Sequence, residues 1–103
     1  MIDKTAYMRE YMKRPEAKEA QRHRKRKQLY GLSPEQFEAL VALQQGACGI
    51  CLQEMETPFV DHDHVSGRVR GLLCAQCNTG LGMFQDDPAI ILRASLYLTA
   101  HRG

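Results

Sequence analysis

The chain carries the pair Cys48-Gly49-Ile50-Cys51 and a second pair, Cys74-Ala75-Gln76-Cys77, with 22 residues between them. Two Cys-x-x-Cys pairs in one small chain are typical of a Zn²⁺ site in which four thiolates surround one ion. A site closed by four cysteines is structural, because no coordination position is left for a reacting molecule. The alternatives are a redox-active pair or two disulfides, but neither explains why the pairs flank one intervening segment.

The length of 103 residues predicts one domain, and a core of that size stabilises a fold only weakly. A single zinc ion per chain would supply the missing stability. No N-terminal stretch resembles a signal peptide, and no stretch approaches the roughly 20 apolar residues of a membrane span. Because disulfides are rare in reducing compartments, these features predict a cytoplasmic protein that does not interact with membranes.

The segment between the cysteine pairs has the pattern of a β-hairpin. Residues 58–64 and 68–73 resemble two short strands, and Val65-Ser66-Gly67 has the composition of a turn. The second cysteine pair then opens a short helix that ends near Gly82. The fold class that follows is α+β and mainly helical.

Helices are predicted on both sides of the hairpin. Ser33 and Gln36 have the spacing of a capping box, so a helix leads into the first cysteine pair. Asp87-Pro88 predicts the start of a last helix, and two helical pieces are expected over residues 3–13 and about 16–29. One face of the last helix carries Ile91, Ala94, Ser95 and Leu98.

Charge divides the chain into a basic helical arm, residues 1–30, and a zinc-stapled domain, residues 31–103. The arm holds ten Lys and Arg against four Asp and Glu, whereas the domain holds four against eight. Clustered cations suit the neutralisation of nucleic-acid phosphates, although a solvated helix face without a partner is the alternative. The candidate contacts in the arm are Arg22, Arg24, Lys25, Arg26 and Lys27. Arg68 and Arg70 of the second strand are further candidates, with a solubilising role as the alternative.

Between the cysteine pairs lies the run Val60-Asp61-His62-Asp63-His64, whose ionisable groups would be costly to bury without partners. A carboxylate at Asp61 suits Mg²⁺ or Mn²⁺, and a neutral imidazole at His62 could accept a proton from an attacking water. The alternative is a polar strand or loop without chemistry. Because neighbouring side chains of a regular strand face opposite sides, both groups serve one phosphate only if the strand ends or bulges there.

Asn78 directly follows the last cysteine, so a zinc ion would fix the helix that carries it. Its amide oxygen could be a second ligand for the catalytic ion. Taken alone, an asparagine at this position is more often a helix-capping residue.

Taken together, these motifs resemble the phage recombination endonuclease VII family over roughly residues 30–100. The motifs are Cys48-x-x-Cys51, Asp61-His62-Asp63-His64, residues 66–74, Cys77-Asn78 and Gly80-Leu81-Gly82. The resemblance implies a ββα-metal core of the His-Me finger (HNH) type, with a catalytic ion held by Asp61 and Asn78. It also implies that His62 is the general base and that His64 orients or stabilises the scissile phosphate.

The function predicted from the sequence is a metal-dependent DNA endonuclease that hydrolyses phosphodiester bonds, including those of duplex, nicked, branched or junction DNA. Its cofactors would be one structural Zn²⁺ and a catalytic Mg²⁺ or Mn²⁺, and its location the host cytoplasm if a phage encodes it. The oligomeric state is open, a homodimer included. The alternative is a non-catalytic zinc-finger protein that binds DNA, and RNA is not distinguished from DNA because phosphate contacts do not report the sugar.

Overall fold

The computed structural model describes residues 15–102, over which the chain is α+β with four helices and one two-stranded sheet. The predicted helix over residues 3–13 lies outside this range, as does most of the first half of the basic arm. The elements are α2 (Pro15–Tyr30), α3 (Pro34–Leu43), β1 (Phe59–His62), β2 (Val69–Leu73), α4 (Ala75–Met83) and α5 (Pro88–Ala100).

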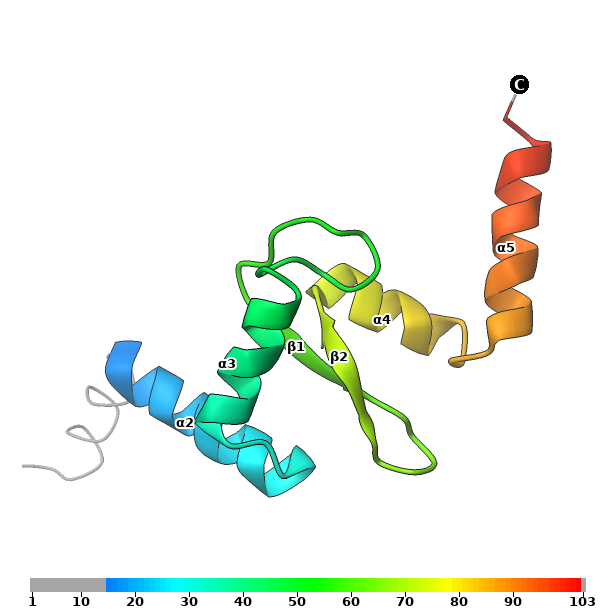
Figure 1. Cartoon of the computed structure of the whole chain (residues 1–103). Helices are drawn as coiled ribbons and strands as arrows, with labels where there is room; N and C mark the ends of the chain where they lie inside the picture. Colours follow the sequence, from blue (N-terminus) through cyan, green and yellow to red (C-terminus); the bar gives the residue numbers. More distant parts are fainter. Residues whose placement is uncertain (1–14, 103) are drawn as a thin grey trace, which may run out of the picture.

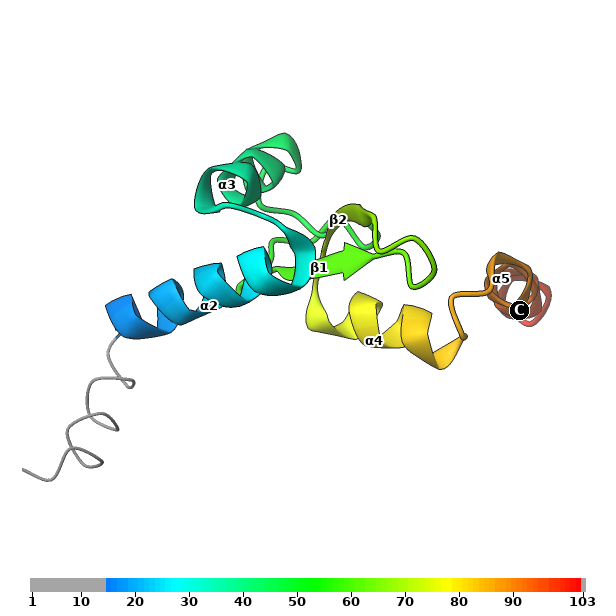
Figure 2. The same ribbon diagram turned by 90° about the horizontal axis from the view of Figure 1, so that it is seen from below.

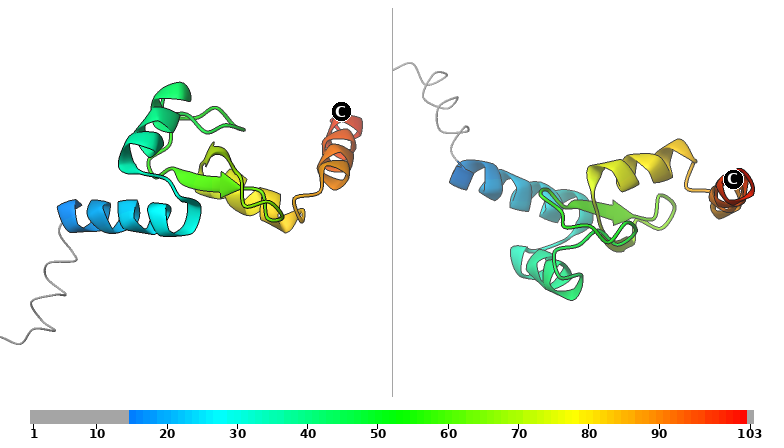
Figure 3. Two further views of the ribbon diagram at one scale, coloured as in Figure 1. Left: turned by 60° about the horizontal axis from the view of Figure 1, so that its bottom comes forward. Right: turned by 90° about the horizontal axis from the view of Figure 1, so that it is seen from above.

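The β-hairpin lies between α3 and α4 near the middle of the molecule (Figures 1 and 2). Helix α3 packs against β2 and α4 packs against β1. Helices α2 and α5 lie at opposite ends, and α5 stands away from the hairpin in every view (Figure 3). The described part of the chain is therefore elongated, with extents of 67 × 27 × 27 Å.

The predicted helix starts are confirmed. Ser33 Oγ accepts the backbone N–H of Gln36 at 3.1 Å, and the Gln36 side chain accepts the backbone N–H of Ser33 at 2.8 Å, which closes the capping box. Asp87 caps α5 by accepting the backbone N–H of Ala89 at 2.9 Å. Such caps satisfy donors that the first turn of a helix leaves free, so short polar motifs fix where these helices begin.

The hairpin turn is wider than the sequence pattern predicts. One Asp63 carboxylate oxygen accepts the backbone N–H groups of Val65 and Ser66, each at 2.8 Å. The donors, Ser66 first and then Val65, also lower the pKa of Asp63. An aspartate that bonds the backbone two and three residues ahead favours a turn over a strand. Strand β1 therefore ends at His62 and not at His64.

The strand pairing contains the irregularity that the Asp61-His62 pair requires. Asp61 is opposite Gly71, but His62 is opposite Val69, so Arg70 is the extra residue of a β-bulge. A bulge redirects the side chain of its extra residue. The prediction that the strand ends or bulges at Asp61-His62 is confirmed in both respects.

The Gln44 side chain ties α3 to the hairpin. Its amide oxygen accepts the backbone N–H of Leu72 at 2.9 Å, and its amide nitrogen donates to the carbonyls of Leu72 and Ala47, each at 2.9 Å. A side-chain amide here makes the bonds that a neighbouring strand would make. Gln44 therefore fixes the outer side of β2 next to the cysteines.

The core is small, and only part of it lies beside the cysteines. The buried apolar residues in the described range are Ala17, Phe37, Cys48, Leu72 and Leu73. Helix α5 contributes none, and its predicted apolar face is not covered. No helix between residues 15 and 102 is long and apolar enough to cross a membrane.

Candidate functional site

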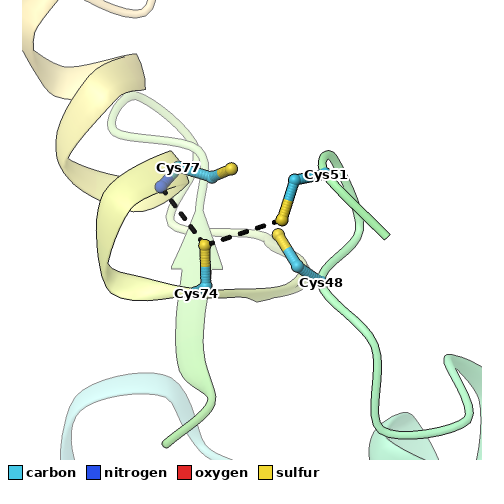
Figure 4. A group of neighbouring side chains, drawn as sticks. All are labelled: Cys48, Cys51, Cys74 and Cys77. Atoms are coloured by element: carbon cyan, nitrogen blue, oxygen red, sulfur yellow. Dashed lines mark hydrogen bonds between the residues drawn. The ribbon is translucent and has the colours of Figure 1, made fainter. Parts of the chain in front are cut away.

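The four cysteines converge, as Figure 4 shows. Cys48 and Cys51 come from the loop after α3, whereas Cys74 caps α4 and Cys77 lies in its first turn. Their four Sγ atoms lie within 4.8 Å of one another, and the Sγ atoms of Cys51 and Cys74 are 3.9 Å apart. Tetrahedral Zn²⁺ with Zn–S bonds of about 2.3 Å places its sulfurs about 3.8 Å apart, whereas a disulfide needs about 2.05 Å. The arrangement suits a zinc ion.

The surroundings of the sulfurs favour a thiolate at Cys48 and disfavour one at Cys77 when no metal ion is bound. The backbone N–H of Ile50 donates to Cys48 Sγ at 3.4 Å, and that of Cys77 donates to Cys74 Sγ at 3.5 Å. Burial raises the pKa of the Cys48 thiol, but backbone N–H donors outweigh burial and lower the pKa to about 6. Burial and hydrogen bonds with the other three thiols raise the pKa of Cys77. All four thiols could ionise this close together only with a cation among them, and a divalent metal ion would supply that charge.

The Asp61 carboxylate is buried and held by Arg70. Asp61 is 8% exposed, and its two oxygens accept Arg70 Nε at 2.7 Å and Nη2 at 2.8 Å. Such a two-point pair fixes the carboxylate in position as well as in charge. The hydrogen bonds with Asp61 also raise the pKa of the Arg70 guanidinium. The bulge at Arg70 therefore aims its guanidinium at the first residue of the Asp-His-Asp-His run.

A chain of contacts continues from Arg70 to the two histidines. Arg70 Nη2 also donates to Asp86 Oδ2 at 3.1 Å, and His64 Nε2 lies 3.5 Å from the same oxygen. The rings of His64 and His62 have centroids 4.8 Å apart. Asp61 and His62, which are neighbours in sequence, are thus joined through three other side chains.

The His62 ring also meets the end of α2. The centroids of the His62 and Tyr30 rings are 5.1 Å apart, with the ring planes inclined by 44°. His62 therefore contacts both an aromatic ring of the basic arm and a second imidazole. These two contacts restrict the orientation of the His62 ring.

Asn78 lies on a different side of the site. Within residues 15–102 it takes no part in the contacts that join Asp61 to His62; instead it lines a groove with Tyr30 and Val60. Asp61 and Asn78 nevertheless come from β1 and α4, which pack against each other. Their carboxylate and amide oxygens are donors that Mg²⁺ prefers, and a carboxylate paired with one guanidinium retains further lone pairs. The donor set therefore fits a hard divalent cation.

A cavity of about 550 Å³ opens beside the histidine pair, between the hairpin turn and the loop after α4. Its lining includes His64, Arg70 and Asp86. Arg70 thus has one side toward the buried carboxylate and another toward this cavity. A phosphate in the cavity would meet the guanidinium and the exposed imidazole.

The predicted cations differ in their surroundings. The Arg26 guanidinium carbon lies 3.5 Å from the centroid of the buried Phe37 ring, so this arginine fastens α2 to α3. Arg22 pairs with Glu19 at 3.2 Å on the surface, where such pairs contribute little. The remaining candidates are exposed: Arg24, Lys25, Lys27 and Arg68.

Three residues of this site were not predicted from the sequence: Tyr30, Gln44 and Asp86. Tyr30 has the pattern of a helix end, and its contact with His62 depends on how α2 turns back. Asp86 adopts a positive φ of 54° after α4, and Asp87 alone has the pattern of a cap. Aspartate is among the residues that tolerate this conformation, so two successive aspartates before a proline were the available signal.

Comparison with known proteins assigns a family to this geometry. A family model described as recombination endonuclease VII matches residues 23–100. The chain belongs to the recombination endonuclease VII family. The matched range contains the four cysteines, the Asp-His-Asp-His run and Asn78, together with residues 23–30 of the arm.

Two phage proteins are similar to this member of the endonuclease VII family. The chain is 41% identical over 73 residues to the Gene 59 protein of Mycobacterium phage D29, and 38% identical over 73 residues to that of Mycobacterium phage L5. Each alignment covers 67% of this chain and 44% of the relative. The chain thus matches less than half the length of these relatives.

Proposed function

We propose that the chain is a metal-dependent DNA endonuclease that hydrolyses phosphodiester bonds, with a ββα-metal core of the His-Me finger type. The observation that carries this proposal is the unbroken chain of side-chain contacts from the buried carboxylate to the imidazole pair. Its members are Asp61, Arg70, Asp86, His64 and His62. The order of β1, β2 and α4, with Cys74 and Cys77 at the start of α4, supports the proposed core. Family membership supports the same activity.

Zinc in the four-cysteine site would be structural. It would anchor the loop after α3 to the start of α4, and so fix the helix that carries Asn78. Asp61 and Asn78 would hold Mg²⁺ or Mn²⁺, which supplies charge stabilisation to the phosphate in the transition state when bound. Arg70 would then share Asp61 with the ion or move toward Asp86, which already accepts a bond from it.

His62 would accept the proton of the attacking water. Imidazole is suited to this role because it can take up a proton near neutral pH. Packing against Tyr30 and His64 restricts the ring, so its orientation is set before substrate binds. His64, exposed beside the cavity with Arg70, would contact the scissile phosphate.

The proposal is tested by cleavage assays with Mg²⁺ and labelled linear, nicked, flapped and four-way DNA. His62→Ala should lower the rate by about a hundredfold or more, the scale of a lost general base. His101→Ala is the matched control, because His101 caps the end of α5 and its ring contacts Tyr97 of that helix, away from the hairpin. Zinc content and DNA binding should stay unchanged in both variants.

Two further variants test the catalytic ion. Asp61→Asn keeps an acceptor for Arg70, and Asn78→Ala leaves the cysteines intact. Each should lower activity in a way that higher Mg²⁺ or Mn²⁺ partly relieves, since a ligand and not a base is lost. Full Mg²⁺-dependent activity of His62→Ala would contradict the assignment of the base.

A non-catalytic zinc-finger protein that binds DNA is the second candidate. The observation in its favour is the two-point pair between Asp61 and Arg70, because it engages both oxygens of the proposed metal ligand. This candidate leaves the packed histidine pair without a role. It would replace the first if the unmodified protein cut none of the substrates with any divalent ion but still bound them.

A further inference from the structure

A groove runs between α2, the start of β1 and α4, on the side of the site where Asn78 lies. It encloses about 290 Å³, which is near the lower end of the roughly 300–1,000 Å³ typical of small-molecule sites. We call it the α2 groove and define it by Arg22, Lys25, Leu29, Tyr30, Phe59 and Asn78. Its size suits a single nucleotide.

The two walls of the α2 groove differ in chemistry. Helix α2 supplies the cations Arg22 and Lys25, and the Arg22 side chain is half exposed. Phe59 lines the same groove from β1, and its side chain is 41% exposed, so its ring is accessible to a ligand there. Cations track phosphates, and exposed aromatic rings stack on unpaired bases irrespective of sequence. The α2 groove therefore combines cations with an exposed aromatic ring, the two features that are typical of a site for single-stranded nucleic acid.

The α2 groove adjoins the reactive residues. Tyr30 lines it and also packs against the His62 ring at 5.1 Å. Val60, the residue before Asp61, and Asn78 line it as well. A ligand in the groove would therefore touch Asn78 directly. It would also touch Val60 and Tyr30, which are the direct neighbours of Asp61 in sequence and of His62 in space.

We propose that the α2 groove binds one unstacked nucleotide of the DNA strand next to the scissile phosphate. The base would stack on Phe59, and the neighbouring phosphates would pair with Arg22 and Lys25. This inference rests on the proposed function, because the neighbouring residues are taken to cleave the bound strand. Binding of the nucleotide itself does not require cleavage. The basic arm thereby contributes a wall of the substrate site and not only a general attraction for DNA.

The chain contains no tryptophan, which allows a direct test of stacking. F59W places one indole in the α2 groove, and F84W places one on a residue of equal exposure, 40%, that does not line the groove. Each protein is titrated with short single-stranded oligothymidylate in Ca²⁺, and the indole fluorescence is measured. We expect quenching for F59W and none for F84W. Equal responses, or no binding of the oligonucleotide, would overturn the proposal.

Affinity measurements on matched variants complete the test. Phe59→Ala should weaken single-strand binding by about tenfold, and Phe84→Ala should not. Lys25→Ala should lower the slope of log affinity against log salt concentration by about 0.7, the share of one phosphate contact, whereas Lys27→Ala outside the groove should change it less. Zinc content and thermal unfolding verify the fold of each variant. Equal losses of affinity in Phe59→Ala and Phe84→Ala, or equal changes of slope in Lys25→Ala and Lys27→Ala, would contradict nucleotide binding in the α2 groove.

Cleavage by the unmodified protein, measured separately, distinguishes the two proposals. Cleavage without indole quenching would contradict the proposed nucleotide site and support the endonuclease activity. Quenching without cleavage would contradict the endonuclease activity and support a site that binds single-stranded DNA.

Discussion

Residues 44–83 and helix α5 differ in how polar groups connect them to the rest of the chain. The first region contains Cys48, Leu72 and Leu73, all buried, and side-chain bonds from Gln44 and Arg70 cross it. Helix α5 is the more apolar segment, yet none of its residues is buried. The difference teaches that apolar content alone does not decide which residues of this chain are buried.

Removal of zinc should have the largest effect on the stability of residues 44–83. Structural zinc sites supply apparent binding free energies of about 10–16 kcal/mol, which exceeds what so small a core contributes. Chelation, or Cys74→Ser, should therefore abolish the cooperative thermal transition of residues 44–83, as followed by circular dichroism. Restoration of the transition by added Zn²⁺ is the control. An unchanged transition in a preparation shown to be free of metal would contradict the proposed staple.

Leu72→Ala should have the next largest effect. Leu72 is fully buried beside the cysteines, and truncation of such a leucine lowers the free energy of unfolding by about 3 kcal/mol through lost burial and the cavity left behind. The measurement is urea unfolding of the zinc-loaded protein. A loss below about 1 kcal/mol would mean that the region closes around the missing side chain.

Gln44→Ala should destabilise the protein by about 2 kcal/mol, because it leaves the Leu72 N–H without its partner and removes two donated bonds. Gln53→Ala is the control, since residue 53 contributes its backbone carbonyl and not its exposed side chain to the cysteine loop. Hydrogen exchange of the Leu72 amide should accelerate only in the first variant. Equal stability of the two variants would show that water replaces the amide.

Arg26→Ala should lower stability by about 1 kcal/mol by removing the cation from the Phe37 ring, whereas the exposed Arg24→Ala should change it little. Thermal unfolding of both variants provides the comparison. If the two variants unfold alike, α2 is not fastened to α3 through this contact.

Leu96→Ala should have the smallest effect, below about 0.5 kcal/mol, because Leu96 is 59% exposed on α5. It is the same substitution as Leu72→Ala, so the two unfolding experiments compare the regions directly. A loss above 1 kcal/mol would show that the apolar face of α5 is covered in solution.

Much of this architecture follows from local sequence signals. The Ser33 and Asp87 caps, the hairpin and the helix that begins after Cys74 are fixed by short polar motifs, which act within a few residues. The convergence of the cysteines follows from their spacing. The irregular pairing at Asp61-His62 could be predicted because two functional neighbours in a strand require it.

Other features depend on tertiary contacts that no local pattern reports. The Tyr30 ring reaches His62 only because the end of α2 lies next to β1, and Gln44 bonds Leu72 across 28 positions in sequence. Arg70 has the sequence pattern of an exposed strand cation, but the bulge turns it onto Asp61. The shortened β1 reflects competition between strand pairing and the Asp63 turn, which the alternation of apolar residues does not reveal.

Gln44 also has a consequence for how copies of the chain behave at high concentration. A two-stranded sheet leaves unpaired backbone groups along its rim, and such rims recruit strands from other molecules into aggregates. The Gln44 amide occupies both the N–H and the carbonyl of Leu72 on the outer side of β2, and the Gly49 N–H shares that carbonyl at 3.1 Å. One glutamine thus occupies the outward-facing backbone groups of β2 at Leu72, so a strand of another molecule could not pair at this position without displacing it.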